Sequence, residues 1–270
     1  MRYTENISIE MYHAMEGLSA SGLPKLEISP AHYQAYKREE RDPTPSLGSL
    51  IHLAVLEPAK FETDVVVVGD LRKTENKNKR DEALASGKFV AREGDYESAK
   101  AVQLAVKNHK MANFLVTKGQ NEISGFARDN ALGIDLKIRP DCLLKDEKII
   151  VDLKSISPMN SRALEKYFYS KRYNYQSAFY RHVNKLITGD DYKMCHLLVE
   201  VADPYAVRLV SFSGAALDLS FERVFELIKT YGECVHKDEW PGYSEEIVEL
   251  GLPNYAMNYD DTNEAAHDYK

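Results

Sequence analysis

Hydrophobic and polar residues alternate along the middle of the chain with the two-residue period of β-strands. In EISGFARDNALGIDLKIRPDCLL, residues 122–144, two alternating stretches flank the turn signal Asp129-Asn130, and this arrangement predicts a hairpin. The polar turn 145–148 then leads to KIIVDLKSI, residues 148–156, which predicts a third strand. The apolar positions expected to share one face of the hairpin's second strand are Leu132, Ile134, Leu136 and Ile138.

Helical patterns dominate the chain before these strands. Residues 6–17 predict a short helix that is stopped by a glycine. Ser29-Pro30 begins a second helix, over 29–40, with the serine as N-cap and the proline in the first turn. Thr44-Pro45 begins a third helix that runs to Pro58, and its mostly apolar residues indicate that it is buried.

The polar stretch from Gly69 to Lys88 has a different character. It is rich in Lys, Asn, Arg and Glu, and we predict a mobile loop there. Such a loop is either a solvated linker or a segment that lies near a polyanion. A long helical region follows as far as Val116.

The second half of the chain returns to alternating helices and strands. A helix is predicted over 161–187, and another over 215–235. Between them lie two strands, 194–201 and 206–212, which are separated by Asp203-Pro204. This order of elements predicts an α/β fold, with a mixed β-sheet flanked by helices and an N-terminal helical region.

We expect a single domain over residues 1–255, because no composition shift marks a boundary. Its N-terminal helices occupy 1–60 and its core occupies 120–235. The last residues, 256–270, are polar and acidic and are expected to be disordered.

Composition narrows the classes of function. The net charge of −7 argues against a protein coated in nucleic acid, although it leaves room for a local basic channel. Three scattered cysteines predict neither a disulfide framework nor an iron–sulfur cluster, and they suit a reducing compartment such as the cytoplasm. No apolar run is long enough to span a membrane, and no Walker A motif predicts ATP binding.

The third predicted strand carries an acid and a base two residues apart, Asp152 and Lys154, so both side chains project from one face. Such a pair alone is most often a surface ion pair. Asp141, however, follows Pro140 eleven residues earlier, and a hairpin of that length brings it beside Asp152. Two close carboxylates repel unless a cation lies between them, and such oxygen-rich sites suit Mg²⁺ or Mn²⁺. Lys154 could then orient or deprotonate a bound water, or neutralise charge in a transition state.

The pattern P-D-x₁₀-D-x-K is the signature of the PD-(D/E)XK nuclease superfamily. Three further features accompany it: His52 in GSLIHLAVLEP, Glu122 at the start of the preceding strand, and Gln176 with Tyr180 in YNYQSAFYRHV. Together they resemble the exonuclease VIII (RecE-type) family, which is related more distantly to the phage lambda exonuclease. The resemblance covers roughly residues 8 to 235.

This resemblance implies roles for individual residues. His52, Asp141 and Asp152 would bind the metal, and the carbonyl of Leu153 would join them. Lys154 would be the catalytic lysine. Glu122 is a candidate for a second metal or the attacking water. Gln176 and Tyr180 would contact the DNA or its scissile region. Arg139 and Arg172 are expected to contact DNA phosphates because of their placement alone, beside Asp141 and four residues before Gln176.

Each assignment has a plainer alternative. A histidine on an apolar helix, such as His52, is usually a core residue with its polar atoms satisfied. Gln176 and Tyr180 could border the apolar stripe of their helix. Glu122 could equally be a solvated strand end. The scattered cysteines also separate this chain from members of the superfamily that carry an iron–sulfur cluster.

The resemblance implies a Mg²⁺-dependent exodeoxyribonuclease, in which Mn²⁺ can substitute, that degrades linear double-stranded DNA from the 5′ end. It also implies a homo-oligomeric ring around the DNA, a RecT-type single-strand annealing protein as partner, and a phage or prophage origin within a bacterial cytoplasm. Two rival functions remain. One is an endonuclease or single-strand nuclease of the same superfamily, and the other is a catalytically inactive module that binds DNA ends.

Overall fold

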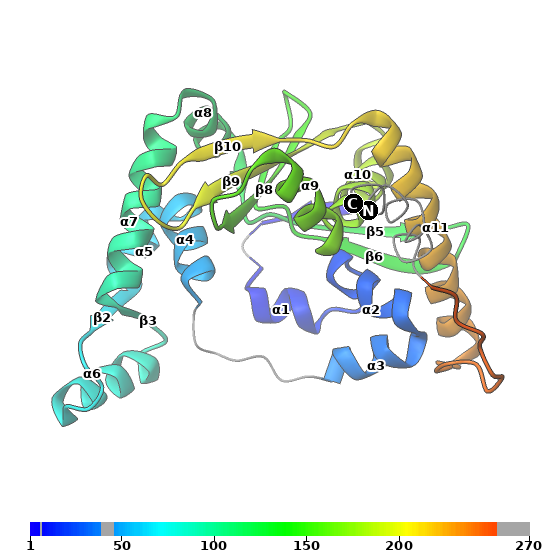
Figure 1. Cartoon of the computed structure of the whole chain (residues 1–270), viewed down its shortest axis with the longest axis horizontal. Coiled ribbons are helices and arrows are strands. Elements are labelled where there is room, and N and C mark those ends of the chain that lie inside the picture. The colour runs from blue at the N-terminus through cyan, green and yellow to red at the C-terminus, as the bar shows by residue number, and fades with distance from the viewer. Residues whose placement is uncertain (6, 39–45, 253–270) are drawn as a thin grey trace, which may run out of the picture.

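The computed structural model describes residues 1–5, 7–38 and 46–252. A five-stranded mixed sheet lies at the centre of the molecule (Figure 1). Strands β8 and β9 are parallel, and the other neighbours are antiparallel. The strands follow the order β10 (Val207–Val210), β9 (Lys193–Glu200), β8 (Ile149–Ile156), β7 (Cys142–Leu144) and β4 (Gln120–Asn121).

A second, three-stranded sheet holds the predicted hairpin. Strand β5 (Ser124–Asp129) pairs antiparallel with β6 (Ile134–Ile138), and β1 (Arg2–Thr4) pairs with the outer edge of β5. Strand β4 leads into β5, and β6 leads into β7. Each strand of the hairpin is therefore connected directly to a strand of the five-stranded sheet, and the two connections lie side by side. The alternation in this region therefore predicted the hairpin correctly, but it did not predict this change of sheet.

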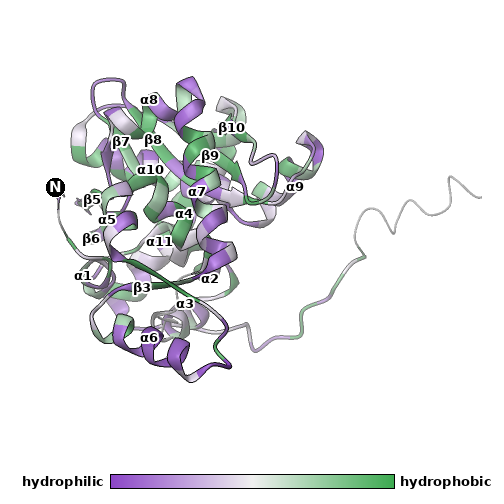
Figure 2. Cartoon of the chain, turned by 90° about the vertical axis from the view of Figure 1, so that its left-hand side faces the viewer, coloured by the Kyte–Doolittle hydropathy of each residue, from purple (hydrophilic) through white to green (hydrophobic). Residues whose placement is uncertain are grey.

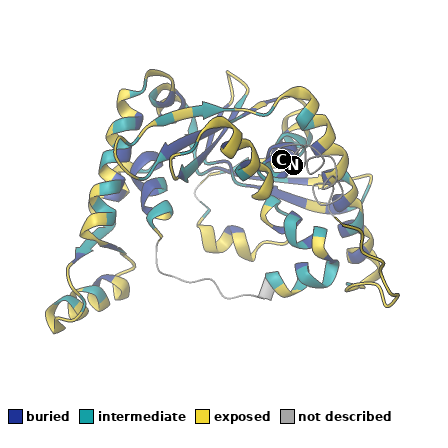
Figure 3. Cartoon of the chain, viewed as in Figure 1, coloured by how far each residue is buried: buried dark blue, intermediate teal, exposed yellow. Residues whose placement is uncertain are grey.

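Helices cover both faces of the five-stranded sheet, as the α/β prediction requires. Alternate residues of β8 face opposite ways: Val151 and Leu153 pack against one set of helices, and Ile150 packs against the other. The first set is α4 (Leu47–Leu56), α7 (Glu93–Asn108) and α8 (Lys110–Lys118), and the second is α10 (Tyr173–Thr188) and α11 (Gly214–Lys237). Figure 3 shows buried residues concentrated in the strands and on the sheet-facing sides of these helices.

Short N-terminal helices pack against the hairpin and the last helix. They are α1 (Ile9–Ala14), the 3₁₀ turn Ala20–Gly22, α2 (Leu23–Ile28) and α3 (Pro30–Arg38). Leu18, Leu23 and Tyr33 join the core cluster that contains the apolar face of β6. Lys137 lies on the opposite face of β6 and is nevertheless only 6% exposed. Its ammonium donates to backbone carbonyls of Tyr12, His13 and Met15, so it holds the C-terminal end of α1.

The prediction of a mobile loop over 69–88 is wrong. Most of this stretch is helix α6 (Thr74–Ala85), which connects the parallel strands β2 (Val65–Val68) and β3 (Phe89–Arg92). Helix α6 and these two strands form an arm that projects from the main body, and α5 (Pro58–Asp64) connects α4 to it (Figures 1 and 2). Helix α6 is hydrophilic along most of its length in Figure 2, and Ala83 is its buried residue.

Several predicted helices have other boundaries. The long helical region expected up to Val116 is divided into α7 and α8, which follow strand β3. The helix expected over 161–187 is divided into α9 (Ser161–Ser170) and α10, because Arg172 adopts a left-handed conformation with φ 56°. The helix expected over 6–17 is limited to α1. Thr44-Pro45 and the acidic segment 256–270 lie outside the described residues. Among the helices that the structure describes, none combines the length and the apolar character needed to cross a bilayer.

Candidate active site

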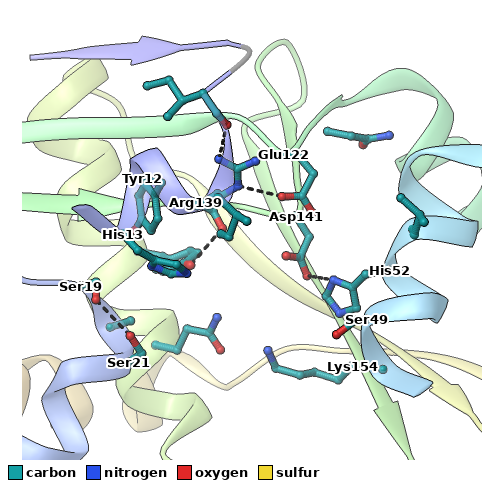
Figure 4. Close-up of a pocket in the computed structure, with 18 of the residues that line it drawn as sticks. Tyr12, His13, Ser19, Ser21, Ser49, His52, Glu122, Arg139, Asp141 and Lys154 are labelled. Carbon is teal, nitrogen blue, oxygen red and sulfur yellow. Dashed lines mark hydrogen bonds and ion pairs between the residues drawn. The ribbon is translucent and has the colours of Figure 1, made fainter. Parts of the chain in front are cut away.

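A cavity of about 1300 Å³ opens between the N-terminal helices, the bent hairpin and helix α4 (Figure 4). It brings together side chains that are up to 175 residues apart, from Glu5 near the N-terminus to Tyr180 on α10. The residues predicted for the site that line it are His52, Glu122, Arg139, Asp141, Lys154, Arg172, Gln176 and Tyr180. Asp152 and Leu153 lie directly behind this lining, in β8.

The bend of the hairpin creates the acidic side of the cavity. Glu122 has φ 54°, a conformation that is uncommon for a residue with a side chain, and Pro140 faces the bend from the other arm. The amide of Glu122 donates to the carbonyl of Asp141 at 3.0 Å, so the two arms stay joined here. The bend therefore turns the Glu122 and Asp141 side chains toward one another instead of along a strand.

The side chain of Asp141 also bonds the edge of β8 at a position where the neighbouring strand β7 does not pair with it. Strand β7 pairs with β8 only from Ile149 to Val151, and the chain turns away at Asp141. The backbone N–H of Leu153 donates to Oδ2 of Asp141 at 2.6 Å. The carbonyl of Leu153 lies 3.0 Å from Nε2 of His52, so this backbone edge faces the site.

His52, Glu122 and Asp141 form a group whose ligand atoms all lie within 4.8 Å of one another. One imidazole nitrogen and two carboxylates are suitable ligands for a divalent cation. Burial raises the pKa of Asp141 to about 7, and the carboxylates of Asp152 and Glu122 contribute to the rise, against the opposing effect of His52 and Lys154. A cation among these groups would relieve the repulsion, so the residues fit a metal site.

Asp152 is 3% exposed and is held by three donors. Nε2 of Gln176 donates to Oδ1 at 2.6 Å. Oδ2 is 2.6 Å from the Lys154 ammonium and 3.2 Å from Nδ1 of His196. An ionised carboxylate has about four lone-pair positions, so these contacts leave about one for a cation.

The charges of this pair are mutually stabilising. Burial raises the pKa of Asp152, but the Lys154 ammonium and the hydrogen bond from His196 outweigh burial and hold the pKa well below its usual range. Burial lowers the pKa of Lys154, but the carboxylates of Asp152 and Asp141 outweigh this effect and raise it. The structure therefore contains a carboxylate and an ammonium side by side, as the D-x-K spacing predicted.

Three side chains that were predicted to contact DNA, those of Arg139, Arg172 and Tyr180, form hydrogen bonds within the protein. Nε of Arg139 donates to Glu122 at 2.8 Å, and Nη1 donates to the carbonyl of Ile7, so the guanidinium orients Glu122. Nε of Arg172 donates to Glu27 at 2.9 Å, which ties α10 to α2. The hydroxyl of Tyr180 donates to the carbonyl of Arg139 at 3.1 Å and so supports the bend.

Sequence patterns missed several residues of this region. Tyr12 and His13 of α1 line the cavity, but nothing in a short N-terminal helix indicated which wall it would form. His196 contacts Asp152 from β9, and the only signal was a polar residue at an inward position of an apolar strand. The burial of Lys137 was missed because alternation places it opposite the apolar face of its strand and does not show that α1 covers it.

A known domain family matches most of this chain. The profile of the family described as "PDDEXK-like domain of unknown function (DUF3799)" matches residues 19–250. No curated protein sequence matches the chain significantly.

Solved structures give a fold-level likeness. The crystal structure of a "putative exonuclease" from Eubacterium rectale superposes with a TM-score of 0.57 and 12% identity, over 95% of this chain and 100% of that one. A phage-related exonuclease from Haemophilus somnus 129PT is similar at a TM-score of 0.38 and 14% identity, over 83% of this chain and 97% of that one. The first likeness supports the α/β fold.

Proposed function

Because the chain belongs to the PDDEXK-like family DUF3799, we propose that it is a divalent-metal-dependent exodeoxyribonuclease. In this proposal it degrades linear double-stranded DNA from the 5′ end and leaves 3′ single strands for recombination, as the resemblance to the RecE-type family implies. The observation that carries the proposal is one cavity that is lined by the His52–Glu122–Asp141 group and by Lys154, with Asp152, the partner of Lys154, directly behind the lining.

We assign Mg²⁺ as the metal, with Mn²⁺ as a substitute. His52, Asp141 and Asp152 would hold it with the carbonyl of Leu153, and Glu122 is close enough to join them. Nε2 of His52 and the carbonyl oxygen of Leu153 are 3.0 Å apart, so both would be near enough to hold the same ion. When bound, such an ion polarises a phosphoryl oxygen and lowers the pKa of a bound water.

The protein's own side chains would complete the chemistry. Lys154 lines the cavity next to Asp152, where its ammonium can orient the attacking water and neutralise charge on the phosphate. Gln176 lines the same wall and can exchange its bond to Asp152 for a contact with the DNA. Tyr180 would act mainly by holding the backbone before Asp141 in place.

An acidic chain must concentrate its positive charge to hold DNA. We propose a homo-oligomeric ring with the duplex inside it, and a RecT-type single-strand annealing protein as the partner that receives the 3′ strand. The arm supports this view. Residues 69–92 contain seven basic and four acidic residues in a chain of net charge −7, and Phe89 of the arm lines the cavity.

The test uses linear duplex DNA labelled at the 5′ or the 3′ end, and closed circular DNA, each with Mg²⁺ or with EDTA. The proposal predicts loss of 5′ label from linear DNA only, dependent on Mg²⁺, and abolished by Asp152→Asn. Cutting of the circle would instead favour an endonuclease of the same superfamily. DNA binding without any cleavage would favour an inactive module that binds DNA ends.

A further inference from the structure

His196 is a fully buried polar side chain beside the candidate site. It lies on β9 directly opposite Asp152 of β8 and is 0% exposed. Nδ1 is 3.2 Å from Oδ2 of Asp152, and Nε2 is 2.9 Å from Oγ of Ser177. It does not line the cavity, so it cannot contact a bound substrate.

The direction of this hydrogen bond follows from its partners. An ionised carboxylate only accepts hydrogen bonds, so Nδ1 of His196 must carry the proton that it shares with Asp152. The Ser177 hydroxyl can either donate to Nε2 or accept from it, because it also lies 2.9 Å from the carbonyl of Tyr173. Either arrangement leaves Nδ1–H directed at Oδ2.

Aromatic rings fix the orientation of the imidazole. Phe168 and Phe212 meet it edge-on at 89°, with centroids 5.2 and 5.9 Å away, and Tyr173 lies 6.0 Å away. These rings keep water away from the bond to Asp152, and a hydrogen bond in such surroundings is stronger than one in water. The strand that carries His196 is itself paired on both sides, with β8 and with β10.

The other two donors to Asp152 lie in the wall of the cavity, where its contents can reach them. Lys154 and Gln176 both line the cavity, where DNA and water compete for their polar atoms. From the cavity wall, Gln176 donates to Oδ1 and Lys154 contacts Oδ2, whereas His196 holds Oδ2 from behind. His196 is thus the donor whose contact with Asp152 does not change when the cavity fills.

We propose that His196 is a positioning residue that fixes the Asp152 carboxylate, so that Oδ1 is presented to the cation and Oδ2 keeps its contact with Lys154. For its consequence in catalysis, this inference rests on the proposed metal-dependent activity. The hydrogen bond itself does not depend on that activity. Removal of a group that orients a metal ligand typically lowers metal affinity about 10- to 100-fold.

The test compares three substitutions of His196. In His196→Asn the side-chain amide can replace Nδ1, whereas in His196→Gln it reaches toward Ser177 and not toward Asp152. His196→Leu supplies no donor. We expect Mn²⁺ affinity, measured by calorimetric titration, and the rate of linear duplex cleavage to fall about 10- to 100-fold in His196→Gln and His196→Leu. His196→Asn should remain within about threefold of the wild type on the same scale.

His182→Leu is the matched control, since His182 is a half-buried histidine of α10 that faces Asp129 away from the cavity. It should leave Mn²⁺ affinity unchanged. Equal losses in His196→Asn and His196→Gln would show a merely structural role and overturn the proposal. Wild-type Mn²⁺ affinity in His196→Leu would also overturn it.

A spectroscopic measurement separates this inference from the proposed function. In the metal-free protein, the Nδ1 proton of His196 should give a protected imidazole signal in ¹⁵N-resolved NMR, and Asp152→Asn should shift it. A His196 ring protonated only at Nε2 would overturn the proposal. If the wild-type protein binds no Mn²⁺ and cleaves no DNA, the proposed function fails, and the NMR result alone decides whether His196 fixes Asp152.

Discussion

The carboxylate of Asp141 accepts the backbone N–H of Leu153 at 2.6 Å, in the position where a neighbouring strand would otherwise pair with β8. The same residue belongs to the group with His52 and Glu122. A single side chain therefore closes the edge of the sheet and contributes to the candidate metal site. This arrangement depends on the bend of the hairpin, where the Glu122 amide bonds the Asp141 carbonyl.

The turn before β4 should be sensitive to a single added methyl group. A Cβ on Gly119 would lie 2.1 Å from Sγ of Cys142, the residue that follows Asp141. We predict that Gly119→Ala lowers the free energy of unfolding by about 1–3 kcal/mol, because such overpacking forces neighbouring groups to move. Denaturant unfolding measures this change.

Gly94→Ala is the control for that variant. Gly94 lies in α7, and nothing comes within 4 Å of its added Cβ. Alanine favours a helix, so we expect unchanged or slightly higher stability. Equal destabilisation by both substitutions would show that the contact with Cys142 is not the cause.

Lys154→Met should reduce cleavage far more than it changes folding. The substitution removes an ammonium that lies 2.6 Å from Asp152 and lines the cavity. Loss of one charge-stabilising donor typically lowers kcat about 10²- to 10³-fold. Lys193→Met, at an exposed position of β9, should keep the wild-type rate. A Lys154→Met enzyme with nearly full kcat would exclude this role.

Metal affinity should depend on pH through Asp141. The pKa of this carboxyl is raised to about 7, so below that pH a proton competes with the cation for the same oxygens. Mn²⁺ affinity should therefore rise about tenfold per pH unit below pH 7 and level off above it. Calorimetric titrations between pH 5.5 and 8.5 measure the profile, and a flat one would refute the prediction.

The arm should contribute to duplex binding through its charge. Lys77 and Lys79 are exposed on α6. Each phosphate contact contributes about 0.9 to the slope of log affinity against log salt. Replacing both lysines with Gln should weaken duplex binding and reduce that slope by up to about 2. The matched pair Lys107→Gln and Lys110→Gln, on α7 and α8, should change neither quantity, and equal effects from both pairs would argue against a role for the arm.

The sequence predicted the elements whose patterns arise from local geometry. Alternation identified the hairpin and β8, and the spacing of Asp141, Asp152 and Lys154 placed all three together. Helix α6 was missed because its packing buries little more than Ala83, so its residues carry no apolar period. The break before α10 was missed because Arg172, in a left-handed conformation, gives no signal of the kind that glycine gives.

Local sequence patterns could not predict contacts between residues that are far apart along the chain. Lys137 looked solvated because the pattern of one strand does not show that α1 covers it. His196 looked like an ordinary residue of an apolar strand, since its partner lies on the neighbouring parallel strand. Local periodicity therefore predicted the site residues of the D-x-K strand, Asp152 and Lys154. It did not predict the residues of other elements that orient them, such as His196.

The most direct test of a cation site at the bend is a titration of the metal-free protein with Mn²⁺. It should include Asp141→Asn and, as control, Asp146→Asn in the exposed turn after β7. Our account predicts that the wild type and Asp146→Asn bind Mn²⁺ with the same affinity and that Asp141→Asn weakens binding at least about tenfold. Absence of binding to the wild type, or equal binding to Asp141→Asn, would contradict it.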